Sequence, residues 1–330
     1  PHWSPDGTRL AYALDLEGEE LFDIHVWDSL TGRHVNLTPD TADSIQPNYA
    51  WSPDGSQIAF ISDRTGRFDT YLMPAEGGSA RPVLSLPCPD WEVRWSPDGR
   101  WLAVVTESTG QDYAIYIVPV GDGALSQDGP GAALPIADGG EPIPAKDAAW
   151  SPDGSRLAFT SNLGGFYNVG IYWISSGHIE WATSGGGDKE QPDWAPDGRR
   201  LAYVINEGPV SRLAVLDLEA NEVHAYQVEA GVHYRPRFTP DGSHLAFVFD
   251  NPRHPDDLWL LSLPLAAGKG AQRQAGDRLR QVTCSLPPKL QGIPFVMPSI
   301  VEYPSLDGKR VPALLYRPIH AGELPPAVLY

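Results

Sequence analysis

The sequence predicts an all-β fold built from repeated units, and three observations support this prediction. No stretch of 10–15 residues has a convincing helical period, whereas short alternating apolar runs are common. Glycine and proline, with 33 residues each, separate these runs and indicate many tight turns. A pentapeptide of the type WSPDG, WAPDG or FTPDG recurs along the chain, at 3–7, 51–55, 95–99, 150–154, 194–198 and 238–242.

The spacing of this pentapeptide predicts the architecture. Successive copies are 44 to 55 residues apart, and a period in the forties with several short strands is typical of β-propeller blades. We therefore expect a β-propeller of four-stranded blades, with six repeats visible and six or seven blades in the intact domain. The aromatic residue that opens each copy is Trp3, Trp51, Trp95, Trp150, Trp194 or Phe238.

The unit around Trp150 shows the expected strand order. One strand ends at Trp150, and three apolar runs separated by turn residues follow at 155–161, 167–175 and 179–184. We label these four strands A to D in chain order. The longest spacing falls just before this unit, where we interpret residues 121–147 as a lengthened loop and connector without an extra element.

Each residue type of the pentapeptide has a structural role. Proline presets φ at the first corner of a turn, aspartate suits the second corner, and glycine accepts the left-handed conformation that closes the hairpin. The preceding aromatic side chain can bury about 150–250 Å² between neighbouring blades. One carboxylate per turn is too few for a calcium site, so we interpret the motif as structural.

Charge and composition exclude several classes of function. A net charge of −18 excludes nucleic-acid binding through general phosphate attraction. The histidines form no metal-binding pair, no phosphate-binding loop is present, and neither a metal nor a cofactor is predicted. Cys88 and Cys284 are expected to be free thiols. No apolar run is long enough to span a membrane, and the expected location is cytoplasmic, with a periplasmic or secreted location left open.

The pentapeptide resembles the repeat of TolB-type propellers and of the propeller domain in the prolyl oligopeptidase family, over about residues 1–285. The repeat then stops, and VEYPSLDGKRVPALLYRP follows at 301–318 as two expected strands around a turn at 306–309. This segment is similar to the opening of the α/β-hydrolase domain in that family, in its acylaminoacyl- and dipeptidyl-peptidase branches. The resemblance implies an N-terminally incomplete propeller at 1–290, and at 291–330 a linker with the first strands of a hydrolase domain that is truncated before its catalytic elements.

The resemblance also implies a function. The propeller would restrict access to a downstream serine peptidase domain, so that short peptides reach a Ser-His-Asp triad. No serine here has the glycine pattern of a G-x-S-x-G elbow, so no catalytic residue is expected in this chain. The implied partners are the chain's own hydrolase domain and a peptide substrate, and a homo-oligomer is left open. The alternatives are a non-catalytic TolB-like interaction scaffold and an enzyme that acts within its own channel.

Strand order predicts where a substrate would meet the propeller. The connector after the last strand D leaves from the face that carries the loops B–C and D–A, so substrate-facing residues should lie there. The principal candidates are Glu19, Glu20, Arg64 and Arg67, and ordinary solvated loops are the alternative interpretation. By resemblance, the Glu19–Glu20 pair invites a role in holding a free amino terminus. Further candidates in these loops are Asp112, Asp188, Lys189, Glu190, Tyr234, Arg235, Arg253 and His254.

Overall fold

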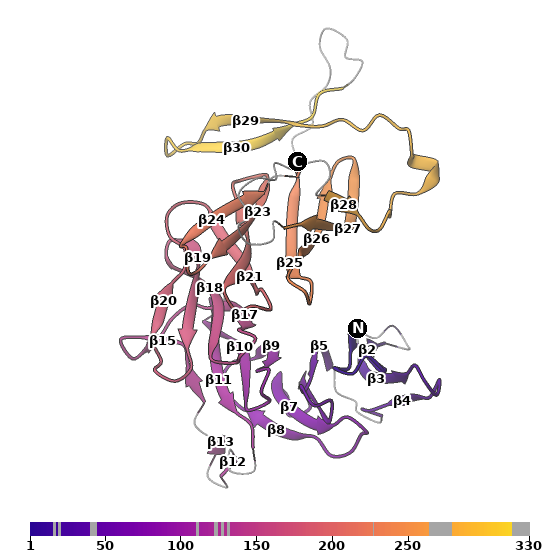
Figure 1. Cartoon of the computed structure of the whole chain (residues 1–330). Helices are drawn as coiled ribbons and strands as arrows, with labels where there is room; N and C mark the ends of the chain where they lie inside the picture. Colours follow the sequence, from indigo (N-terminus) through magenta and orange to yellow (C-terminus); the bar gives the residue numbers. More distant parts are fainter. Residues whose placement is uncertain are drawn as a thin grey trace. The chain divides into compact units, whose positions relative to one another are not determined.

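The structure is a series of four-stranded antiparallel sheets, seen as successive groups of arrows along the chain in Figure 1. This computed structural model describes residues 1–15, 18, 21–39, 45–109, 112–121, 125–126, 129–130, 133–226, 228–263 and 279–318. Within these residues the helical structure is limited to one short turn, η2 (Pro288–Leu290). The chain divides into two compact units, Pro1–Ser184 and Gly185–Tyr330, and each is described by itself.

Among the described residues, unit 1 contains four four-stranded sheets, which we call blades 1 to 4. Blade 1 consists of β1 (His2–Trp3), β2 (Arg9–Leu14), β3 (Asp23–Asp28) and β4 (His34–Asn36). Blade 2 consists of β5 (Ile45–Trp51), β6 (Gln57–Ser62), β7 (Asp69–Pro74) and β8 (Arg81–Leu84). Blade 3 consists of β9 (Asp90–Trp95), β10 (Trp101–Thr109), β11 (Asp112–Pro119) and β14 (Leu134–Pro135). Blade 4 consists of β17 (Lys146–Trp150), β18 (Arg156–Gly164), β19 (Phe166–Trp173) and β20 (Ile179–Trp181).

The interpretation of residues 121–147 as a plain connector was wrong in detail. This stretch contains β14, the strand D of blade 3, and two short strand pairs. The pairs are β12 (Leu125–Ser126) with β13 (Gly129–Pro130) and β15 (Ala137–Asp138) with β16 (Glu141–Pro142). Strands of two residues carry no alternating apolar signal, so the sequence pattern could not reveal them.

Unit 2 contains two further blades and a hairpin. Blade 5 consists of β21 (Asp188–Trp194), β22 (Arg200–Asn206), β23 (Ser211–Asp217) and β24 (Glu222–Tyr226). Blade 6 consists of β25 (Val232–Phe238), β26 (His244–Asn251), β27 (His254–Ser262) and β28 (Leu279–Gln281). The hairpin pairs β29 (Ser299–Pro304) with β30 (Arg310–Leu315) around a turn at Gly308, which confirms the two strands and the turn expected at 301–318.

The Ser-Pro-Asp-Gly turns are closed by their own side chains. In the first copy Ser4 donates a hydrogen bond to Asp6 over 2.6 Å, and Asp6 accepts a second bond from the Thr8 amide. The amide of Arg9 in turn donates to the Ser4 hydroxyl. Gly7 has φ of 70°, a conformation that a residue with a Cβ adopts only with strain. The motif therefore fixes the A–B hairpin, as predicted, through hydrogen bonds of its own residues.

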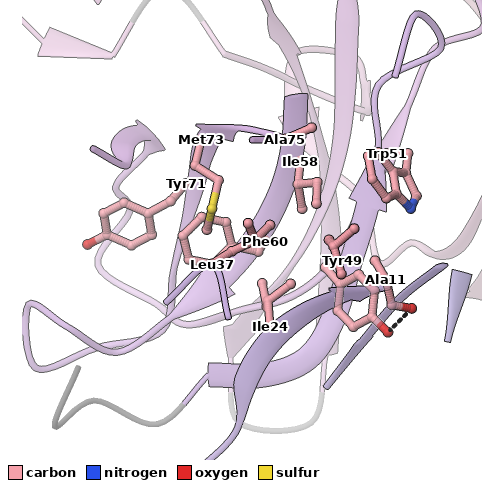
Figure 2. Packing of buried hydrophobic residues seen from close by; sticks show 11 residues of the cluster. Ala11, Ile24, Leu37, Tyr49, Trp51, Ile58, Phe60, Tyr71, Met73 and Ala75 are labelled. Carbon is pink, nitrogen blue, oxygen red and sulfur yellow. Dashed lines mark hydrogen bonds between the residues drawn. The ribbon is translucent and has the colours of Figure 1, made fainter. Parts of the chain in front are cut away.

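The repeated tryptophans tie neighbouring blades of unit 1 together. The indole nitrogens of Trp51, Trp95 and Trp150 each donate to a backbone carbonyl of the preceding strand A, at 3.0, 3.2 and 3.3 Å. Trp51 is buried beside the apolar cluster that joins blades 1 and 2 (Figure 2). There Ala11 and Ile24 of blade 1 pack with blade 2. Trp51, Trp95 and Trp150 thus make contacts between blades, whereas Trp3 is 53% exposed.

A second repeated device lies between strands C and D. The hydroxyl group of Thr38 donates to Asp23 at the start of β3 and accepts the amide of Ile24. Thr183 makes the same two contacts in blade 4 and Thr283 in blade 6. A single short side chain thereby accepts a strand-C amide and binds the side chain of the residue just before it, which is Asp23, Asn168 or Asp257.

Strand A of several blades contains a bulge close to its aromatic residue. Three non-glycine residues, each three positions before the aromatic, have left-handed backbones: Asp147 (55°), Gln191 (57°) and Arg235 (52°). The ladder of each of these strands changes register at this point. In unit 2 the Gln191 side chain accepts the Arg235 amide at 2.6 Å, so the bulge also joins blades 5 and 6.

Candidate ligand-binding cleft

Unit 2 contains a cleft of about 570 Å³ between its blades and its hairpin. The B–C turns of blades 5 and 6 contribute residues 209–210 and 250–252, and the D–A connection between the blades contributes residues 230–232. Ligand pockets in proteins typically measure about 300–1,000 Å³, so the cleft has room for a small ligand or part of a peptide.

The hairpin and its connector form the facing wall of the cleft. Met297 and Pro298 of the connector line it together with Ile300, Leu314 and Tyr316, which are 51%, 42% and 53% exposed. The hairpin also approaches the β22–β23 turn closely, because a Cβ atom on Gly208 would lie 3.3 Å from Pro312. In unit 2 the hairpin therefore lies by the loops B–C and D–A, the face that strand order predicts.

Asp250 is the carboxylate in this lining. The Tyr234 hydroxyl group donates a hydrogen bond to Asp250 and also lies 3.2 Å from an oxygen of Asp256. Burial raises the pKa of the Tyr234 phenol above its ordinary value, and the two carboxylates raise it further. The phenol therefore remains a hydrogen-bond donor at neutral pH and holds the Asp250 carboxylate in place.

Asn251 fixes the turn that carries Asp250. Its side-chain oxygen accepts the amides of Arg253 and His254 at 2.8 and 3.0 Å, and its amide nitrogen donates to the Ala230 carbonyl at 3.2 Å. Close packing adds to this restraint, since a Cβ atom on Gly231 would lie 2.4 Å from the carbonyl oxygen of Asp250. The B–C turn of blade 6 and the D–A connection thus form one fixed edge of the cleft.

The basic candidates of this edge are paired with an acid. Nitrogen atoms of Arg253 and His254 each lie 3.8 Å from the carboxylate of Glu229. The predicted residues Tyr234, Arg253 and His254 are therefore gathered at one end of blade 6. Arg235 instead takes part in the strand-A bulge through its backbone.

The candidates of blade 5 have structural contacts. Lys189 is only 6% exposed and donates to the carbonyl groups of Gly185 and Gly186 at 2.9 and 2.7 Å, and burial lowers its pKa. Glu190 accepts a hydrogen bond from the Asn206 side chain at 2.7 Å. Neither residue lines the cleft.

In unit 1, Arg64 and Arg67 are held by neighbours in their own blade. The Arg67 guanidinium lies 3.0 Å from Asp69 and donates to Ser85, while that of Arg64 lies over the ring of Tyr71 at 4.7 Å. Near this loop, burial raises the pKa of Asp90 to about 7, and the charge of Asp69 contributes to the rise. Glu19 and Glu20 lie outside the described residues, so the substrate roles of these four candidates stay predictions.

The sequence analysis predicted Tyr234 as a site residue but missed Asp250 and Asn251. These are the last two residues of β26, which is strand B of blade 6. Within the described ranges no three His, Cys, Asp or Glu side chains are grouped so that they could hold a metal ion. The described part of the chain also has no helix with the length and apolar character needed to cross a membrane.

Comparison with known proteins places the chain among the propellers. Residues 1–112 match the family model of the TolB beta propeller domain. The uncharacterized peptidase YuxL of Bacillus subtilis strain 168 is 39% identical over 92 residues, which are 26% of this chain and 14% of that protein.

Solved structures share the fold over nearly the whole chain. A puromycin-hydrolyzing peptidase of Mycobacterium tuberculosis matches with a TM-score of 0.69 and 18% identity, covering 93% of this chain and 48% of its own. A putative TolB from Agrobacterium tumefaciens matches with a TM-score of 0.54 and 18% identity. The match covers 94% of this chain and 100% of the TolB chain. The chain thus spans about half the length of the peptidase that it matches. The chain has a TolB-like β-propeller fold, and this fold is similar to that of the propeller domain of prolyl oligopeptidase-type peptidases.

Proposed function

We propose that this chain is the propeller part of a serine peptidase of the prolyl oligopeptidase type and that it governs which peptides reach the catalytic domain. The observation that carries the proposal is the cleft of unit 2, because one wall is propeller and the other is the hairpin β29–β30. That hairpin is the segment whose sequence resembles the opening of an α/β-hydrolase domain. A ligand in the cleft would contact both parts at once.

The chain's own contribution is binding and exclusion rather than bond cleavage. The Ser211 hydroxyl lies 3.1 Å from Nδ1 of His233, but these side chains are only 2% and 1% exposed. Ser211 also accepts the backbone amide of His233 at 2.6 Å, and burial lowers the pKa of this histidine to about 4. A buried pair of this kind has no access to a scissile bond. Acyl transfer would require a serine, a histidine base and an oxyanion hole in the downstream domain.

The test is hydrolysis by the full-length protein that contains this chain. We expect a fluorophosphonate probe to label it, and we expect it to cleave short fluorogenic peptides while leaving a folded protein of the same cleavage sequence intact. Cleavage of the folded protein at a similar rate would contradict the gating role. Absence of labelling and of peptide cleavage would contradict the peptidase assignment itself.

The second candidate is a non-catalytic scaffold that binds other proteins. It is favoured by the match of residues 1–112 to the TolB propeller and by the TolB structure that the chain covers completely. This function needs no serine nucleophile, so the same fluorophosphonate experiment separates the two. An unlabelled full-length protein would favour the scaffold.

A further inference from the structure

Among the described residues that line it, the cleft of unit 2 combines apolar walls with one carboxylate. Val210 and Val232 line the blade side and Ile300 and Leu314 the hairpin side, whereas Asp250 is the acidic residue among the lining side chains. Pockets of this kind bind mainly through apolar contact and use a few polar groups to select the ligand. The chemistry of Asp250 therefore decides which ligands fit.

The ion pairs of the described residues leave the negative charge of Asp250 without a cation. Among the residues that the structure describes, no lysine, arginine or histidine forms an ion pair with it. The nearby basic side chains of Arg253 and His254 are directed to Glu229 instead. A carboxylate can accept about four hydrogen bonds, and the Tyr234 hydroxyl takes only one of these positions.

The position of the carboxylate is fixed before a ligand arrives. Tyr234 holds the side chain, and Asn251 and Gly231 fix the turn that carries it. The Tyr234 hydroxyl also lies 3.2 Å from an oxygen of Asp256, which adds a second negative charge nearby. A fixed and partly desolvated carboxylate binds a cationic nitrogen more strongly than a mobile surface group does.

We propose that this cleft selects ligands in which a positively charged nitrogen adjoins an apolar group, with Asp250 holding the nitrogen and the hairpin wall holding the apolar part. The nitrogen of a peptide can be its free amino terminus or a lysine side chain. The proposal rests on the proposed function, since it names the class of peptide that the propeller admits.

The binding test uses two small probes that a peptidase cannot hydrolyse. They are 4-phenylbutylamine, which is cationic at pH 7, and 4-phenylbutan-1-ol, its uncharged counterpart. Calorimetric titration of the full-length protein should show that the amine binds at least about 10-fold more tightly than the alcohol. The variant Asp250→Asn should abolish this preference, because the amide keeps the shape of the side chain without its charge.

Two further variants serve as controls for the charge and for the apolar wall. Glu222→Gln removes a carboxylate of β24 that is exposed and outside the cleft, and it should leave the preference unchanged. Leu314→Ser should weaken the amine and the alcohol alike, because it alters only the apolar wall. Urea unfolding of each variant checks that the fold is retained. Equal binding of the two probes by the native protein, or a preference that persists in Asp250→Asn, would overturn the proposal.

Peptide substrates then identify the source of the charge. The KM for a short peptide with a free amino terminus is compared with that of its acetylated form, and an acetylated lysine peptide is compared with its norleucine counterpart. The proposal is supported if the peptide with the free amino terminus or the lysine peptide has a lower KM than its uncharged counterpart and if this difference disappears in Asp250→Asn. A full-length protein that cleaves no peptide but still prefers the amine probe would remove the peptidase assignment and leave the charge selection standing.

Discussion

The indole nitrogen of Trp51 lies 3.0 Å from the carbonyl oxygen of His2, one strand A upstream. Trp95 and Trp150 repeat this contact with the next two blades. The repeated aromatic therefore does more than fill space, since it pairs a backbone carbonyl between blades while burying a large apolar ring. This relation gives a physical reason for tryptophan at these three positions, because phenylalanine has no such donor.

Replacing Trp51 by phenylalanine should destabilise unit 1 by about 1–2 kcal/mol, because it removes the indole donor and leaves the His2 carbonyl without this partner. Urea unfolding followed by circular dichroism measures the change. The matched control is Trp3→Phe, whose side chain is 53% exposed, and it should cost less than about 0.5 kcal/mol. Equal losses in both variants would contradict the role of the blade-to-blade hydrogen bond.

The turn aspartates should make the fold sensitive to acid. Hydrogen bonds from Ser52 and from Ser56 hold the pKa of Asp54 below its ordinary value. A carboxyl group whose pKa is lowered by folding stabilises the protein above its unfolded pKa, and this stabilisation is lost as the pH falls through the folded value. Asp54→Ala should therefore lower the unfolding midpoint at pH 7 and have a smaller effect at pH 3. Thermal melts at the two pH values check this, and an effect that grows in acid would contradict it.

His233 should make unit 2 lose stability below pH 6.5. Burial lowers the pKa of His233 from its ordinary value of 6.5 to about 4. Between pH 6.5 and pH 4 the histidine is therefore protonated in the unfolded chain and neutral in the folded chain, which favours unfolding. The expected loss is about 2 kcal/mol between pH 7.5 and pH 5. His233→Leu should lose less over this range, whereas His224→Gln, at an exposed position, should behave like the native protein. An unchanged pH profile in His233→Leu would show that another group is responsible.

Gly231 should tolerate no side chain. A Cβ atom there would lie 2.4 Å from the backbone oxygen of Asp250 and 2.6 Å from the Phe249 ring, so the strands β25 and β26 would have to separate. We expect Gly231→Ala to cost at least about 2 kcal/mol in urea unfolding. Gly164→Ala is the control, because nothing lies within 4 Å of its Cβ position. A loss in the control as large as that in Gly231→Ala would contradict the packing argument.

The sequence was sufficient for the repeated parts of the molecule and insufficient for the cleft. The Ser-Pro-Asp-Gly turns and the hairpin at 301–318 follow from local residue types, and each formed where expected. The left-handed residues of two bulges, Gln191 and Arg235, are not glycines, so the sequence does not predict a left-handed backbone there. The neighbourhood of Tyr234 and Asp250 depends on the register of β25 against β26, in which Val232 pairs with Asp250.

The loop residues Arg64 and Arg67 also show what the sequence could not predict. Arg64 and Arg67 were plausible substrate contacts by their place in the chain. Their surroundings include Asp69 two residues after Arg67 and the Tyr71 ring beneath Arg64. Whether such a loop residue meets a ligand depends on local partners, which a pattern of spacing does not specify.

The most direct test of the account is peptide hydrolysis by the full-length protein after the cleft is filled. Leu314→Trp adds a large ring to the hairpin wall, and Leu306→Trp places the same ring at the fully exposed hairpin turn. If the cleft admits the peptide, Leu314→Trp should lower kcat/KM for a short peptide by at least about 10-fold, and Leu306→Trp should leave it unchanged. Equal activity of both variants and the native protein would contradict a role of the cleft.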